Sequence, residues 1–114
     1  MKRLYLVAIF FALFLSTVAK ADYVYGAETT IKRVATFASG SVAGDIIISV
    51  DNTVAGCEAG YYVGVNALGK DESLSIALSA FHAGSKVKIN GLDTPRWEGS
   101  SSNYCKIESL HIIK

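Results

Sequence analysis

A polar segment late in the chain combines residue types that could recognise a ligand. It carries one indole ring, Trp97, among the charged and amide side chains of Asp93, Arg96, Glu98 and Asn103. Aromatic rings stack on the apolar faces of sugars or bases, while polar side chains fix the orientation of the bound group. We therefore predict that Arg96, Trp97 and Asn103 contact a ligand.

Tyr62 is a further candidate for ligand contact. It lies in the apolar segment 60–66, and the alternation of a strand places its ring on the face opposite the core. Gly64, on the same face, has no side chain that could cover this ring. The alternatives are that Tyr62 covers Gly64 across a sheet, and that Trp97 packs over one end of the fold as part of the core.

The two cysteines of the chain, Cys57 and Cys105, are predicted to form a disulfide. An even number of cysteines in an exported chain is typical of a disulfide, and only one intramolecular pairing exists here. The bond would close a loop of 48 positions. A redox pair is the alternative, but the Cys-x-x-Cys spacing typical of that chemistry is absent from the sequence.

Signals for metal binding or catalysis are weak. His82 and His111 are isolated in the sequence, whereas zinc sites usually draw on closely spaced ligand pairs. The sequence contains no GxSxG elbow, HExxH pair, Walker loop or dinucleotide-binding fingerprint. The ten acidic residues are scattered. We expect no metal, no cofactor and no enzymatic activity.

Residues 1–21 are predicted to be a cleaved secretory signal peptide. A basic start precedes the unbroken apolar run Leu4–Leu15, and Ala19–Ala21 has the small-x-small pattern of a cleavage site. A membrane anchor is the alternative, but a helix of that run spans only ~18 Å of a bilayer core about 30 Å thick. We expect cleavage before Asp22, no membrane span after cleavage, and one secreted or periplasmic domain over residues 22–114.

Charge and composition exclude further classes of protein. Residues 22–114 contain eight basic and ten acidic residues, a formal net charge of −2. Nucleic-acid binders usually carry a surplus of basic residues that displaces counterions, so no nucleic-acid partner is expected. Hydrophobic residues make up 51% of the chain, which is incompatible with disorder throughout.

Periodicity predicts five strands. Within 30–39 the apolar residues lie three apart, a spacing that suits a helix or a strand with a β-bulge, and the many Thr and Val residues favour the strand. The pattern of 104–113 slips in the same way, and 22–29 could be an arm or a short edge strand. The predicted strands are 30–39, 45–50, 60–66, 85–90 and 104–113.

One helix is predicted over residues 70–83. Leu74, Leu78 and Phe81 lie at i, i+4 and i+7, with Ala77 beside this apolar stripe. Gly84 supplies the left-handed residue that commonly ends a helix. We expect the stripe to face the core, so that Leu74→Asp unfolds the domain.

The order β-β-β-α-β-β in so short a chain predicts a mainly β fold with one helix. A strongly curved sheet of five strands can close on itself with the helix over one open end, which is the Greek-key barrel called the OB-fold. In that fold the third and fifth strands run parallel side by side, which would bring Cys57 close to Cys105. A helix packed on an α+β sandwich is the alternative, and it does not explain the placement of the cysteines.

The segment Ser73–Ile89 (SLSIALSAFHAGSKVKI), followed by Trp97, resembles the B subunits of AB5 toxins, in particular the subtilase-cytotoxin and pertussis-like B subunits. The similarity lies in a helix, a glycine, a Val-basic-Ile strand and then a tryptophan, and the placement of Cys57 and Cys105 is also similar. It covers about half of residues 22–114 with generic motifs. Those subunits often have more cysteine pairs, and their sugar-contacting serine loop has no definite counterpart here.

The resemblance implies an OB barrel, a ring-shaped homo-pentamer and a cell-surface glycan as ligand. The sequence is thus consistent with two functions. One is a secreted binding module that recognises a glycan in the manner of a toxin B subunit. The other is a periplasmic structural or protein-interaction domain of the same fold, for instance an inhibitor or an envelope stress protein, whose partner is an envelope protein.

Overall fold

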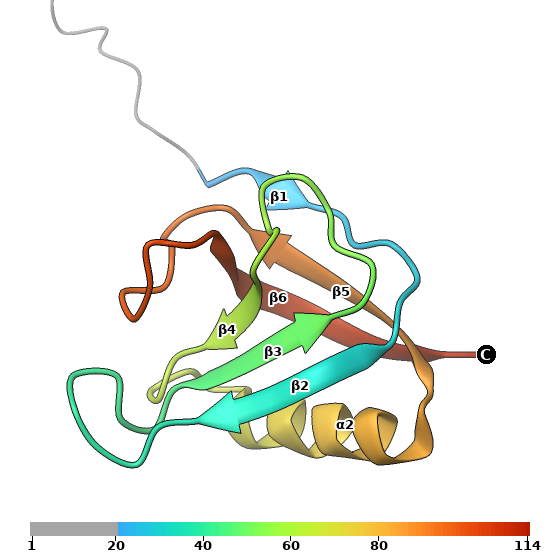
Figure 1. The fold of residues 1–114 in the computed structure, drawn as a ribbon, viewed down its shortest axis with the longest axis horizontal. Helices are drawn as coiled ribbons and strands as arrows, with labels where there is room; N and C mark the ends of the chain where they lie inside the picture. Colours follow the sequence, from blue (N-terminus) through green and yellow to red (C-terminus); the bar gives the residue numbers. More distant parts are fainter. Residues whose placement is uncertain (1–20) are drawn as a thin grey trace, which may run out of the picture.

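The computed structural model describes residues 21–114, which form a curved six-stranded sheet and one helix (Figure 1). The predicted mainly β fold with one helix is confirmed, but the structure has six strands instead of five, because residues of the 22–29 segment form a short edge strand. The predicted signal peptide, 1–21, lies outside the described residues except for Ala21. The elements are β1 (Tyr23–Val24), β2 (Ile31–Thr36), β3 (Ile46–Val50), β4 (Gly60–Val63), α2 (Lys70–Ala83), β5 (Lys86–Leu92) and β6 (Tyr104–Ile113).

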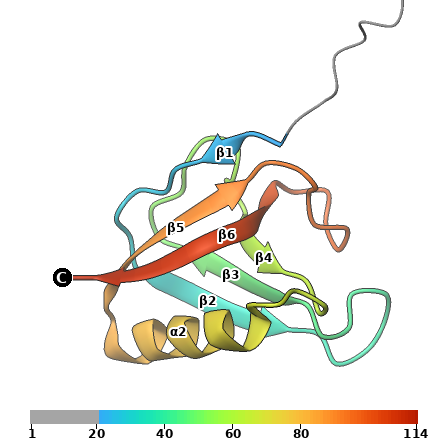
Figure 2. The same cartoon turned by 180° about the vertical axis from the view of Figure 1, so that it is seen from behind.

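The strands are ordered β1-β5-β6-β4-β3-β2 in the sheet. Neighbouring strands are antiparallel except for β4 and β6, which run parallel. Thr29, just before β2, forms an isolated antiparallel bridge with Val87, which joins the start of β2 to β5. The sheet is curved, as Figures 1 and 2 show: β2–β4 lie on one side, β5 and β6 lie on the other, and α2 runs beneath both groups.

Both predicted β-bulges are present. The register of β2 against β3 shifts between Ile31 and Arg33, and the register of β6 against β5 shifts so that Glu108 is the unpaired extra residue. In a regular strand, residues three positions apart point to opposite faces. One extra residue between them lets both point to the core. As a result, Val34 and Leu110 pack against the core despite the slip in alternation.

The main core lies between the two groups of strands and above the helix. On β5, Val87 and Ile89 are fully buried while Lys86 and Lys88 are exposed, which is the alternation of a strand with one face on the core. Every residue of β3 is buried, because side chains pack on both faces of this strand. The largest fully buried side chains of the core are Ile46, Ile48, Ile89, Val50 and Val87.

The predicted disulfide between Cys57 and Cys105 is present, with a Cα–Cα distance of 5.3 Å. The parallel pairing of β4 with β6 sets Tyr61 opposite Cys105, so the chain just before β4 lies at the start of β6. Both cysteines are at most 1% exposed and belong to the main core. The bond therefore ties together two strands that are distant in the sequence.

The helix has the predicted bounds but presents a different face to the sheet. The fully buried residues are Ala77 and Ala80, whereas Leu78 and Phe81 are 39% and 41% exposed, and only Leu74 of the predicted stripe packs against the core. The stripe lies about 90° around the helix axis from the buried alanines, at 100° per residue. Small side chains let α2 approach β2 and β6 closely, so the large apolar residues remain at the flank.

The predicted strand 60–66 is shorter in the structure. It ends at Val63, because Gly64 begins a turn in which its carbonyl oxygen accepts a hydrogen bond from the N–H of Ala67 at 3.0 Å. Val65, which the alternation of a strand over 60–66 would place on the core face with Val63, is 44% exposed. Its backbone N–H instead takes part in the candidate site described next.

Candidate functional site

A second apolar cluster lies on the outer face of the sheet. Ile47 points away from the main core, because its neighbours Ile46 and Ile48 point into it. Tyr62 pairs with Ile47 across β3 and β4 and shares this face, and Trp97 from the β5–β6 connection packs on both. The connections 37–45 and 93–103, which lie on the same side of the molecule in Figure 1, cover the cluster.

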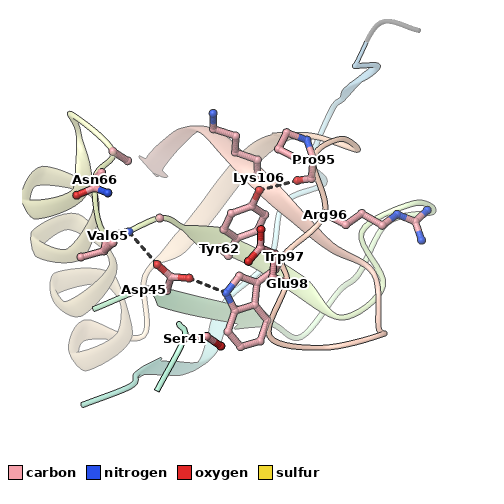
Figure 3. A pocket seen from close by; sticks show the side chains of 12 residues that line it. Ser41, Asp45, Tyr62, Val65, Asn66, Pro95, Arg96, Trp97, Glu98 and Lys106 are labelled. Atoms are coloured by element: carbon pink, nitrogen blue, oxygen red, sulfur yellow. Dashed lines mark hydrogen bonds between the residues drawn. The ribbon is translucent and has the colours of Figure 1, made fainter. Parts of the chain in front are cut away.

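Asp45 fixes the position of the indole ring. Its Oδ2 accepts a hydrogen bond from Trp97 Nε1 at 3.0 Å, and its Oδ1 accepts one from the backbone N–H of Val65 at 2.8 Å (Figure 3). Both carboxylate oxygens therefore hold neighbouring segments in place. Hydrogen bonds to a charged acceptor are stronger than neutral ones, so this carboxylate links the start of β3, the turn after β4 and the β5–β6 connection.

The ring of Trp97 is only 6% exposed. Phe37 and Tyr104 pack against it with centroid distances of 5.4 and 5.2 Å, the latter edge-on. Gly99 lies against the ring so closely that a Cβ at this position would be 2.3 Å from the indole. The indole thus packs as core on the outer face of the sheet. It does not present an open face for stacking, and it does not cover an end of the fold, as the alternative interpretation proposed.

Tyr62 is 8% exposed, so the prediction of an uncovered ring is wrong. Its hydroxyl donates a hydrogen bond to the carbonyl oxygen of Pro95 at 2.5 Å, which brings the β5–β6 connection over the strand. Burial, with the nearby negative charges of Asp45 and Glu98, raises the pKa of the Tyr62 hydroxyl. The ring is covered because a distant segment folds over it, which the absence of a side chain at Gly64 could not reveal.

The cluster forms the floor of a cleft of about 510 Å³. Lys106, paired with Tyr62 in the parallel register of β4 and β6, stands at its rim next to Tyr62, and Asn66 lies apart from it, near Val65 (Figure 3). Within residues 21–114, the polar side chains of Ser41, Asn66, Glu98 and Lys106 form no hydrogen bond to the rest of the chain. The lining residues are Ser41, Asp45, Tyr62, Gly64, Val65, Asn66, Ala67, Pro95, Arg96, Trp97, Glu98 and Lys106.

Arg96 borders this cleft, but its side chain points away from Tyr62 and Trp97 in Figure 3. Its guanidinium donates to Oδ1 of Asn103, and the Asn103 amide donates to Oε2 of Glu58 at 2.9 Å. The structure therefore brings the four predicted ligand-contacting residues together only in pairs. Tyr62 and Trp97 form the cleft floor, while Arg96 and Asn103 join a separate network around Glu58.

Glu58 is the centre of this network. Its Oε1 accepts the backbone N–H of Gly56 at 2.8 Å, on the turn that carries Cys57. The Gly56 N–H, the Asn103 amide and the charge of Arg96 favour the ionised form and lower the pKa of the Glu58 carboxyl to about 2. The Arg96–Asn103–Glu58 network thus connects the β5–β6 connection to the turn that carries Cys57. A second hollow of about 430 Å³ lies there, lined by Glu58, Ala59, Ser102 and Asn103.

Sequence reasoning missed Asp45 and Lys106. Asp45 directly precedes an apolar strand. A carboxylate there is either a turn residue or an acceptor for buried N–H groups, so its position was the one sequence signal for its role. Lys106 lies between the buried Cys105 and the partly buried Ile107, and this alternation places it on the outer face. Neither signal could identify the neighbours in the cleft, because Trp97 reaches Asp45 and Tyr62 reaches Lys106 from distant parts of the chain.

Comparisons with protein-family models, with curated proteins and with solved structures find no match. In the part of the chain that the structure describes, no three or more His, Cys, Asp or Glu side chains are grouped to hold a metal ion. Nor does a helix within residues 21–114 have the length and apolar character needed to cross a membrane.

Proposed function

We propose that this protein is an exported, non-enzymatic binding module of the OB-fold type that recognises a glycan. The order of β2 to β6, the parallel pair β4 and β6, and the helix between β4 and β5 support the OB assignment for residues 22–114. The Thr29–Val87 bridge supports closure of the barrel between its first and fourth strands. β1 is then an addition to the five-stranded pattern.

The observation that carries the proposal is the cleft over Tyr62 and Trp97. A sugar presents many hydroxyl groups, and the cleft offers an ammonium group at Lys106, an amide at Asn66 and a carboxylate at Glu98, none of them bonded within the described chain. The floor is fixed by the Asp45 and Pro95 hydrogen bonds, so little conformational entropy is lost on binding. Arg96, which borders the cleft, would contribute to sugar binding at its edge.

The hydrogen bonds made by Asp45, the carboxylate at the cleft floor, are consistent with a binding role. Both oxygens of Asp45 accept N–H groups of the chain itself, so this residue positions the cleft. The buried disulfide supports export to an oxidising compartment, either secretion or the periplasm. If the resemblance to toxin B subunits holds, the protein is a homo-pentamer that binds a cell-surface glycan.

The test is binding of the exported, disulfide-intact protein to an array of immobilised oligosaccharides. We expect Lys106→Ala and Asn66→Ala to reduce binding at the cleft, and Lys86→Ala, a lysine on another part of the surface, to leave it unchanged. If the folded protein bound none of the oligosaccharides, the proposed glycan-binding function would be refuted. Light scattering under the same conditions reports whether the protein is a pentamer.

A second candidate function, a protein-interaction domain of the cell envelope, is favoured by the helix. Leu68 just before α2 is fully exposed, and Leu78 and Phe81 present large apolar side chains on the flank of α2. Apolar surface of this kind often marks a contact with another protein. Capture of a defined envelope protein by the parent chain, lost in the variant Leu78→Ser with Phe81→Ser, would support this candidate, whereas a pentamer that no longer forms in that variant would favour the toxin-like assembly.

A further inference from the structure

Two exposed tyrosines lie at the edge strand, Tyr23 within β1 and Tyr25 directly after it. Tyr23 is 41% and Tyr25 is 72% exposed, and their ring centroids are 4.6 Å apart with an interplanar angle of 56°. An aromatic pair of this size usually finds a partner surface, because each ring carries a large apolar area. Here the rings rest on each other and leave the face of Tyr25 open to solvent.

The backbone that carries these rings is held on both sides. Tyr23 pairs with Leu92 in the β1–β5 register, and the N–H of Gly26 donates to Oδ1 of Asn90 at 3.0 Å. Asn90 is itself 9% exposed. A Cβ at Gly26 would be 1.9 Å from the carbonyl oxygen of Ile89, so glycine allows the chain to lie directly on β5. Tyr25 is therefore an exposed ring on a fixed support.

Hydrogen-bonding groups line one side of the tyrosine pair. The Tyr23 hydroxyl donates to Oε2 of Glu108 at 2.6 Å, and the β6 bulge at Glu108 directs this carboxylate toward β1. The hydroxyl of Ser109 lies 3.2 Å from Asn90 Nδ2 and 3.1 Å from His111 Nε2. The hydrogen bonds from Tyr23 and Ser109, together with His111, lower the pKa of the Glu108 carboxyl, so it is an acceptor at neutral pH.

We propose that Tyr23, Tyr25 and Glu108 form a second carbohydrate site, which takes one neutral sugar ring. The apolar C–H face of the ring stacks on Tyr25, and a sugar hydroxyl donates to the free lone pairs of Glu108. A neutral sugar is favoured because a carboxylate is the charged group nearest the rings. This inference rests on the proposed glycan-binding function and adds to it a site that does not involve the cleft.

Polar side chains around the rings favour a sugar over a protein partner. On β6, the Glu108 carboxylate bonds Tyr23, and the Ser109 hydroxyl next to it in the chain contacts the His111 imidazole, so polar groups border one side of the pair. A protein contact would require a wider buried area, of several hundred Å² on each partner. One sugar ring matches the size of the tyrosine pair and uses both its apolar and its polar groups.

The test uses protein exported from the full chain and immobilised oligosaccharides that end in galactose, glucose, N-acetylglucosamine or sialic acid. Tyr25→Ala should weaken binding of at least one neutral oligosaccharide about tenfold, while Tyr25→Phe keeps it within about twofold, because the ring and not its hydroxyl makes the contact. Glu108→Gln should weaken the same binding about tenfold, because a charged acceptor becomes neutral. Both positions are exposed, and thermal unfolding of each of the three variants checks the fold.

Lys106→Ala separates this site from the cleft. Neutral sugar binding that survives Lys106→Ala but not Tyr25→Ala supports the second site, and so do ring-proton shifts of Tyr23 and Tyr25 without a shift of the Trp97 indole in a titration followed by NMR. Full binding by Tyr25→Ala with loss in Lys106→Ala would overturn this inference and leave the cleft proposal standing. An equal loss in Tyr25→Ala and Tyr25→Phe would also overturn it, and no binding by the folded parent would overturn both proposals.

Discussion

The backbone N–H of Asp22 donates a hydrogen bond to Oδ1 of Asp93 at 2.8 Å, and the N–H of Asp93 donates to the carbonyl oxygen of Asp22 at 3.1 Å. Asp22 is also the residue at which the predicted leader cleavage would create a new α-ammonium group. Processing would therefore replace a neutral donor with a charged one that faces the same carboxylate. The two bonds join β1 to the segment that covers the cleft.

A chain that begins at Asp22 should be more stable than one that retains Ala21. The gain expected for an exposed ion pair is about 0.5 kcal/mol, which corresponds to a rise in Tm of about 2–4 °C for a domain of this size. Thermal unfolding at low salt measures the difference, and added salt should reduce it. In Asp93→Asn the difference should vanish, because the acceptor remains but its charge does not. Equal Tm values for the two unsubstituted chains would contradict the prediction.

The disulfide should contribute strongly to the free energy of unfolding. Cys57 and Cys105 are 48 positions apart in the sequence. For a closed loop of that length the loop-entropy model gives a stabilisation of about 4 kcal/mol. We expect the double variant Cys57→Ala, Cys105→Ala to lower the free energy of unfolding by about that amount in urea denaturation. The parent protein with its disulfide intact, in the same urea series, is the reference. A loss below about 1 kcal/mol would show that the bond adds little to a fold that is already stable without it.

Substitutions on the helix should reveal which face meets the sheet. Ala80→Leu introduces a large side chain into the close contact between α2 and the sheet and should destabilise the protein by about 1–3 kcal/mol. Leu78→Ser lies on the exposed flank and should change the free energy of unfolding by no more than about 0.5 kcal/mol. Leu74→Asp should also destabilise, because Leu74 packs against the core. A larger effect of Leu78→Ser than of Ala80→Leu would place the stripe, not the alanines, against the sheet.

Glu58 should contribute to stability in a defined pH range. Its pKa is about 2 in the folded protein against an ordinary value of 4.5, so the native state favours the ionised carboxyl. The contribution is therefore fully present above pH 4.5 and is lost as the pH falls from there towards about 2. Denaturation of the parent between pH 2 and pH 6 should show a steeper acid loss than denaturation of Glu58→Gln. Glu28→Gln, which leaves the Gly56 and Asn103 hydrogen bonds intact, is the control, and parallel curves for the parent and Glu58→Gln would contradict the assignment.

The sequence was informative where a local pattern determines the structure. The two bulges followed from apolar residues spaced three apart, and the Cys57–Cys105 bond followed from an even cysteine count with the expected parallel strands. The helix face could not be predicted, because hydrophobicity scales rank Leu78 above Ala77 whereas close packing here requires the smaller side chain. Burial of Trp97 depends on Phe37, Tyr104 and Gly99, residues that the pattern around Trp97 cannot identify as its neighbours.

The floor of the cleft depends on Asp45, and its removal should be visible in the single tryptophan of the chain. In Asp45→Asn, one of the two oxygens that accept N–H groups from Val65 and Trp97 becomes an amide nitrogen, which is itself a donor. Loss of one bond to a charged acceptor should cost about 2 kcal/mol in the free energy of unfolding. The indole should move from its buried position, so its fluorescence maximum shifts to longer wavelength and sugar binding at the cleft weakens. Asp51→Asn, a carboxylate that bonds the Thr30 hydroxyl away from the cleft, should leave the emission unchanged. An unshifted Trp97 emission in Asp45→Asn would show that the packing of Phe37 and Tyr104 alone holds the ring, and that the carboxylate is not what fixes the floor.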